Sequence, residues 1–145
     1  MSCVMPCAVG VDRYMLKTYL LTGKTDPRYL DMYKESAEGI MNHVIKRTAG
    51  WTHTTELSGR KANNVMEHLC CFFGGLFALG YSGLKDELHQ PRKHLKTAEE
   101  LTETCFQSYN TTATGIGPEA MVRLALICAL PGTHPFPSRC GQIGF

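Results

Sequence analysis

Apolar residues recur at helical spacing along much of this chain, and the first such pattern lies near its start. Tyr14, Met15, Tyr19 and Leu20 fall on one face of a helix, and Thr22-Gly23 supplies a C-terminal stop. A second helix is expected directly afterwards, because Asp26 is a favourable N-cap and Pro27 suits the first helical position. With so short a link, we expect the two helices to pack as an antiparallel pair.

The second helix carries a long apolar stripe opposite a polar face, and we expect it to end at Ala49-Gly50. Near that end Lys46 and Arg47 would complement the negative pole of the helix dipole. The stripe comprises Tyr29, Tyr33, Ala37, Ile40, Met41, Val44 and Ile45.

Residues 66–79 predict a third helix that is apolar on nearly every side after Leu69, as expected for a helix packed between neighbours. Gly74 and Gly75 lie within it. Each glycine costs about 1 kcal/mol of helix propensity relative to alanine. The pair therefore indicates the close approach of another element.

The rest of the chain alternates between connections and one more helix. Residues 51–60 are rich in threonine and include Ser58-Gly59, which favours a short strand or hairpin on the rim. Residues 85–96 are polar and contain a proline, so they predict a connection. A helix follows, with Ala98, Leu101, Cys105 and Tyr109 at helical spacing, and it is expected to end before a turn region at residues 110–118.

This succession of helices and short connections is typical of bundles, solenoids and toroidal helical barrels alike. A length of 145 residues favours one domain. The chain is 43% hydrophobic and 19% charged, as in folded globular proteins, and its formal net charge of +2 gives no reason to expect a nucleic-acid partner.

The composition also bears on membranes and export. The longest apolar stretch, residues 69–79, is too short for a membrane span, which needs roughly 20 residues. The first ten residues lack the basic and apolar regions of a secretory signal. We therefore expect neither a membrane span nor a signal in this chain.

Seven cysteines are many for a chain of this length, and their odd number leaves at least one unpaired. Their spacing lacks the paired two-residue pattern of structural zinc sites, so we assign no metal-binding residue. The spacing alone leaves the pairing of several cysteines open: Cys3, Cys7, Cys70, Cys128 and Cys140.

An acid and a histidine, Glu67-His68, lead into the apolar segment at residues 69–79. A charged group beside apolar surroundings needs partners or a ligand to offset its desolvation. The placement therefore suggests the wall of a pocket.

Several separated motifs together resemble the class I α-1,2-mannosidases, glycoside hydrolase family 47. The resemblance covers residues 14–119, whereas residues 1–13 and the irregular Pro-, Gly- and Cys-rich tail at residues 120–145 do not match. Within the family, the motifs look most like those of the Golgi and fungal processing enzymes. The matching motifs are Tyr14-Met15-Leu16-Lys17, residues 66–80, residues 98–105, Ser108-Tyr109-Asn110 and Thr114-Gly115-Ile116-Gly117-Pro118-Glu119.

The resemblance implies an all-α fold that is part of an (α/α)7 barrel, a helical toroid, left incomplete by this chain. It also implies an inverting hydrolase, a mannosyl-oligosaccharide 1,2-alpha-mannosidase that trims α-1,2-linked mannose from high-mannose N-glycans in the Golgi or endoplasmic reticulum. The family binds calcium at the base of its barrel. Inversion requires two converging carboxyl groups, roughly 6.5 to 9.5 Å apart.

The resemblance implies roles for three residues. Glu119 matches a family glutamate assigned as a proton donor, His68 a histidine that lines the sugar-binding core, and Glu67 a position that is normally acidic. Taken alone, Glu119 fits better as an ordinary glutamate at a helix start after Pro118. His68 taken alone fits a hydrogen-bonded core histidine.

The resemblance also implies that Cys71 and Cys105 form the family's disulfide, the alternative being two buried free thiols. Closing that loop would contribute about 3 to 4 kcal/mol. Asn110-Thr111-Thr112 is an N-glycosylation sequon in a predicted turn, to be used only if the chain reaches the secretory lumen.

The chain also departs from the family pattern. Val9 stands where the family's catalytic aspartate is expected, and Asp12 is out of register with it. The family's Arg-Pro-Glu motif and its calcium-binding threonine are missing from these 145 residues. We therefore expect this chain alone to be an inactive fragment. The alternative is a non-enzymatic glycan-binding or helical interaction protein that retained one wall of the barrel.

Overall fold

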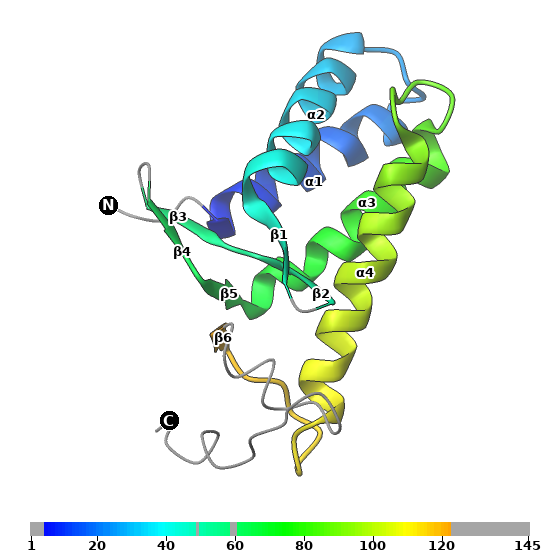
Figure 1. Cartoon of the computed structure of the whole chain (residues 1–145). Helices are drawn as coiled ribbons and strands as arrows, with labels where there is room; N and C mark the ends of the chain where they lie inside the picture. Colours follow the sequence, from blue (N-terminus) through cyan, green and yellow to red (C-terminus); the bar gives the residue numbers. More distant parts are fainter. Residues whose placement is uncertain (1–4, 49, 59–60, 123–145) are drawn as a thin grey trace.

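The computed structural model describes residues 5–48, 50–58 and 61–122. Helices dominate this part of the chain, and three antiparallel strand pairs lie at one end of them (Figure 1). The α-helices are α1 (Met5–Leu21), α2 (Pro27–Gly39), α3 (Phe72–Leu84) and α4 (Pro91–Asn110). The paired strands are β1 (Ile45–Thr48) with β2 (Trp51–Thr54), β3 (Glu56–Ser58) with β4 (Lys61–Asn63), and β5 (Val65–Glu67) with β6 (Ala120–Val122).

The link between the first two helices forms as the sequence predicts. Gly23 adopts a left-handed backbone with φ 71° directly after α1, which is the usual way to end a helix. At the start of α2, Asp26 accepts a hydrogen bond from the backbone N–H of Arg28 at 3.1 Å, so it caps the helix.

The end of the second helix is not as predicted. The α-helix stops at Gly39 and continues only through one π-helical segment, η1 (Ile40–Val44). Lys46 and Arg47 then lie in strand β1, where they pair with His53 and Thr52 of β2. Pairing with a later strand has overridden the helical periodicity, which does not register contacts distant in sequence.

The strands correct the all-α expectation. A hairpin was expected at residues 51–60, and the structure confirms strands there, but they are not a rim loop because Thr52 and Thr54 are buried. The polar groups of Thr52 are satisfied inside, because the Thr104 hydroxyl of α4 donates to its carbonyl at 2.6 Å and its own hydroxyl donates to Glu100 at 2.8 Å. The Thr54 hydroxyl is buried without a hydrogen-bond partner among the described residues. The described residues do not form a closed (α/α)7 barrel.

The third and fourth helices begin at other residues than the sequence suggested. Residues 65–67 form β5, a 3-10 segment η2 (His68–Cys71) follows, and only then does α3 begin. The partner of β5 is β6, which lies in the segment predicted to be an irregular tail. Pro91, expected in a connection, is instead the first residue of α4, where its missing N–H costs no helical hydrogen bond.

Helix α3 packs between α1 and α4 in the core of the described region (Figure 1). The expected close approach is confirmed at Gly74, where an added Cβ would meet the Thr102 hydroxyl of α4 at 2.6 Å, but Gly75 faces open space. Phe72 is 51% exposed, so α3 is not enclosed on all sides as predicted. The largest fully buried apolar side chains are Leu16, Tyr33, Met66, Phe73, Phe77, Leu84 and Leu101.

Candidate active site

The strand pair β5–β6 brings the three candidate site residues together. Glu67 pairs with Ala120 in the ladder, and one residue further the backbone N–H of His68 donates to the Glu119 carbonyl oxygen at 2.8 Å. Residues from two distant sequence motifs therefore meet at the end of one short ladder.

Glu119 lies in an exposed bend that leads directly into β6. No helix begins after Pro118 in the part of the chain that the structure describes, so the reading of Glu119 as a helix-start residue is wrong. Its side chain is exposed, which leaves the carboxyl group accessible to a ligand.

His68 is partly buried, and its imidazole contacts both the hydroxyl group and the ring of Tyr109. The Nε2 atom is hydrogen-bonded to the Tyr109 hydroxyl, and the two rings meet edge to face with their centroids 5.6 Å apart. His68 is thus hydrogen-bonded, as a structural histidine would be, yet it also lies beside Glu119.

Tyr109 is a site residue that sequence reasoning missed. It was counted as one apolar position of a helix, although the Ser-Tyr-Asn motif that contains it was part of the resemblance. Only the fold shows that the end of α4 comes back to His68. The Ser-Tyr-Asn motif was the one sequence signal that pointed to Tyr109, because helical spacing does not reveal which group a tyrosine hydroxyl contacts.

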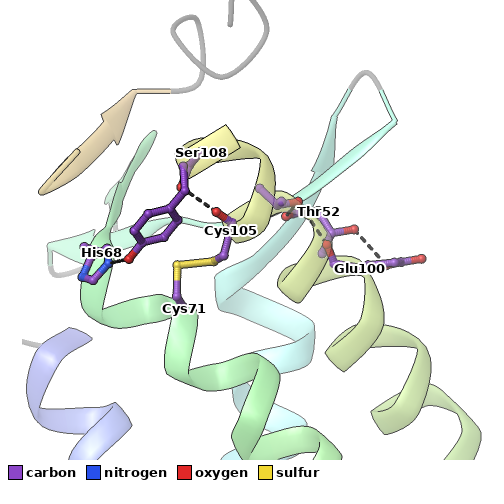
Figure 2. The surroundings of a disulfide bond; sticks show 8 residues. Thr52, His68, Cys71, Glu100, Cys105 and Ser108 are labelled. Atoms are coloured by element: carbon purple, nitrogen blue, oxygen red, sulfur yellow. Dashed lines mark hydrogen bonds between the residues drawn. A yellow bond between two sulfur atoms is a disulfide. The ribbon is translucent and has the colours of Figure 1, made fainter. Parts of the chain in front are cut away.

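A disulfide joins Cys71 of η2 to Cys105 of α4, with the Cα atoms 5.9 Å apart (Figure 2). The alternative of two buried free thiols is therefore wrong. Ser108, one turn further along α4, donates to the Cys105 carbonyl at 2.7 Å. Cys70, next to the bridge, is a buried free thiol whose pKa is raised mainly by burial. The bridge ties the backbone next to His68 to the helix that carries Tyr109.

Asn110 is the last residue of α4 rather than part of the following turn. Its side chain is exposed, and it donates a weak hydrogen bond to Gln107 at 3.3 Å. The hydroxyl of Thr112, the third residue of the sequon, donates to the Tyr109 carbonyl at 2.9 Å. Exposure leaves the asparagine accessible, and its glycosylation stays a prediction.

Asp12 lies away from this site. It is 2% exposed on α1, close to Tyr33 and Ser36 of α2, so its carboxyl group is enclosed in the protein. The family's aspartate position, Val9, is in α1, but its side chain lies outside the described residues, as do Cys3, Cys128 and Cys140.

Calcium requires six to eight oxygen ligands, usually with several carboxylates. Across residues 5–48, 50–58 and 61–122, no three His, Cys, Asp or Glu side chains gather closely enough to hold a metal ion. The described residues therefore do not fit a calcium site. No helix among them is long and apolar enough to cross a bilayer.

Comparisons with known proteins agree with the motifs. The sequence profile described as Glycosyl hydrolase family 47 matches residues 13–125, which is most of the chain. This match places the chain among the glycoside hydrolases. The chain belongs to glycosyl hydrolase family 47.

Two curated relatives show the extent of the similarity. Mannosyl-oligosaccharide 1,2-alpha-mannosidase of Candida albicans is 40% identical over 124 residues, covering 75% of this chain and 22% of the relative. Mannosyl-oligosaccharide 1,2-alpha-mannosidase IA of Sus scrofa is 38% identical over 108 residues, covering 74% of this chain and 16% of the relative. The chain thus spans only about a fifth of these relatives.

A solved structure shows the same fold. The alpha-1,2-mannosidase from Trichoderma reesei matches with a TM-score of 0.68 and 26% identity. The match covers 90% of this chain and 26% of that enzyme. The described arrangement of helices and strand pairs is therefore a section of a larger known architecture.

Proposed function

We propose that this chain is a section of the catalytic domain of an α-1,2-mannosidase, which removes α-1,2-linked mannose from high-mannose N-glycans with inversion. Its catalytic section is residues 14–119, within an incomplete (α/α)7 barrel. The observation that carries the proposal is the hydrogen bond from the backbone N–H of His68 to the backbone carbonyl of Glu119, because it brings two separate motifs together beside the exposed Glu119. The names of the relatives supply the reaction.

In this proposal each residue has a chemical task. Glu119 protonates the oxygen of the leaving sugar, which requires an accessible carboxyl group. Glu67 accepts hydrogen bonds from sugar hydroxyls, and the His68 imidazole orients them. Inversion also needs a carboxylate that activates water, and Val9 cannot supply it.

Calcium is the family's cofactor, and its site belongs to protein outside the described residues. The 145-residue chain is therefore expected to bind mannoside without turning it over.

The proposal includes a secretory location, in the Golgi or endoplasmic reticulum. The disulfide Cys71–Cys105 supports it, because such bonds persist in oxidising compartments and are rare in the cytosol. The exposed sequon at Asn110 is compatible with the same lumen. Secretory expression of the chain followed by N-glycosidase treatment tests this part: a mobility shift that Asn110→Gln abolishes is expected, and an unmodified Asn110 would contradict it.

The binding claim is tested by titrating the isotope-labelled chain with α-1,2-mannobiose and following backbone amide resonances. We expect saturable shifts at residues 67, 68, 109 and 119, which His68→Ala abolishes. His43→Ala is the matched control, because His43 is exposed and lies outside the site. Equal shifts with an unrelated disaccharide, or none at these residues, would contradict the claim. Binding without release of mannose by a complete domain would favour a glycan-binding protein.

A further inference from the structure

We propose that Tyr109 is a positioning residue: its hydroxyl holds the imidazole of His68, and its ring supports the segment that carries Glu119. The His68 imidazole and the Glu119 carboxyl group would then keep fixed positions relative to one bound sugar. The benefit for sugar binding rests on the proposed function. The effect of Tyr109 on the His68 imidazole can be tested without a substrate.

The first observation is the contact between Tyr109 and His68. The hydroxyl is hydrogen-bonded to Nε2, and the rings pack edge to face at a centroid distance of 5.6 Å. A neutral imidazole has one donor and one acceptor nitrogen, and the partner of one nitrogen decides which tautomer is favoured. A phenolic hydroxyl can donate or accept, but it donates more strongly than it accepts, so the Tyr109 hydroxyl is expected to donate to Nε2. This contact would favour the His68 tautomer that carries its proton on Nδ1, and it would fix the orientation of the ring.

The second observation lies on the other side of the tyrosine. A Cβ added at Gly117 would come within 3.0 Å of the Tyr109 ring, so the backbone of the Gly-Pro-Glu motif passes directly against that ring. Two residues later, the Glu119 carbonyl accepts the hydrogen bond from the His68 N–H. The contacts close a loop from Tyr109 to His68, to Glu119, and back through Gly117.

The third observation is that Tyr109 itself has a fixed support. It lies one turn after Cys105, which is bonded to Cys71 at the end of the segment that contains His68. Its carbonyl accepts from the Thr112 hydroxyl at 2.9 Å. A functional group is positioned best by a neighbour whose own rotamer and backbone are held.

The test compares Tyr109→Phe, which removes only the hydroxyl, with the unaltered chain. In ¹⁵N NMR spectra of the neutral imidazole, we expect one dominant His68 tautomer in the unaltered chain, with the proton on Nδ1. Loss of the hydrogen bond should change the tautomer ratio by about three- to tenfold. Tyr14→Phe is the matched control, since Tyr14 is 67% exposed, and it should leave the ratio unchanged.

A second variant keeps the test decisive if Tyr109→Phe folds poorly. Gly117→Ala keeps the hydroxyl but places a methyl group against the ring, so it should change the His68 tautomer ratio and speed exchange of the His68 amide hydrogen. Unchanged tautomer ratios in the folded variants would overturn the positioning role.

Titration with α-1,2-mannobiose separates this inference from the proposed function. A positioning role predicts that Tyr109→Phe weakens binding by about three- to tenfold, while Tyr14→Phe binds as the unaltered chain does. If the tautomer responds but no form of the chain binds the disaccharide, the positioning role stands and the proposed function fails. If the disaccharide binds equally well to Tyr109→Phe, the positioning role fails and the proposed function stands.

Discussion

At the scale of single residues, the clearest energetic conflict is the burial of Asp12. Its Oδ2 atom and the nearby Tyr33 hydroxyl are both buried without a hydrogen-bond partner among the described residues. Burial raises the pKa of Asp12 above its ordinary value of 3.8, and a hydrogen bond with Ser36 offsets only part of that rise. Burial and the Asp12 charge likewise raise the pKa of Tyr33.

Asp12→Asn should stabilise the chain at neutral pH. Because folding raises the pKa of Asp12, its contribution favours the folded state at low pH and is lost as pH rises through the folded-state pKa. Removing the charge should gain about 1 to 3 kcal/mol at pH 7, and less near pH 4. Urea unfolding at both pH values measures this. An equal effect at the two pH values would show that the charge is not the cause.

Gly80→Ala should destabilise the fold. A Cβ on Gly80 would come within 2.0 Å of the Tyr33 hydroxyl and 2.9 Å of the ring, and the fully buried tyrosine has little room to yield. We expect a loss of about 1 to 3 kcal/mol in the free energy of unfolding. Gly75→Ala on the same helix is the control, because nothing lies near it, and it should be neutral or slightly stabilising. Equal effects at both positions would contradict the packing argument.

The sequence identifies Glu67, His68 and Glu119 through motifs, but it gives Tyr109 no role. The difference is physical. A motif can be matched residue by residue, whereas the contacts of Tyr109 exist only because the end of α4 returns to β5 and to Gly117. The burial of Asp12 was likewise not predictable, since periodicity gives no preference to an acid on a buried helix face.

At the scale of elements, two links to α4 hold the 3-10 segment η2 and the β1–β2 strand pair in place. One is the disulfide Cys71–Cys105. The other centres on Glu100, whose Oε2 atom accepts from Arg47 of β1 at 2.7 Å and from Thr52 of β2 at 2.8 Å (Figure 2). Together they fix the end of the structure where the candidate site lies.

Removing the disulfide should cost about 3 to 4 kcal/mol, because the sequence separation of 34 residues closes a long loop in the unfolded chain. The double variant Cys71→Ala and Cys105→Ala, unfolded in urea, measures this loss. Cys70→Ala estimates the cost of removing one buried sulfur without a bridge. A double variant no less stable than Cys70→Ala would contradict the account.

Glu100→Gln should destabilise the chain by about 1 kcal/mol at pH 7. Burial raises the pKa of Glu100, but hydrogen bonds from Thr52 and Arg47 outweigh it and leave the pKa below its ordinary 4.5. A lowered carboxyl pKa stabilises the folded state at pH values above the ordinary pKa of 4.5. This stabilisation is lost as pH falls through the folded-state pKa. The difference in the free energy of unfolding between the unaltered chain and Glu100→Gln should therefore vanish at low pH. A difference that persists at pH 3 would show another cause.

Elements supported by local chemistry were predicted well, such as the Asp26 cap and the stop at Gly23. Elements that depend on distant partners were not. Residues 45–48 and 66–67 lie within predicted helices, but pairing with other strands decides their conformation.

At the scale of the whole molecule, the described helices and strand pairs correspond to about a quarter of the Trichoderma reesei enzyme. The exposed apolar side chains of α1 and α3, among them Val11, Tyr14 and Phe72, lie on the surface of this section. The sequence motifs predicted the family, whereas the pairing of strands that are distant in sequence was revealed only by the structure.

The most direct measurement is catalysis by a complete domain that contains this section. Residues 13–125 would replace the matching segment of the Candida albicans relative, and release of mannose from an α-1,2-mannoside would be followed. The account predicts an active chimera in which Glu119→Gln lowers kcat/KM by about 10² to 10⁴. Glu38→Gln, at an exposed glutamate of α2, should have no effect. A folded chimera that is inactive, or one that Glu119→Gln leaves fully active, would contradict the proposed role of this chain.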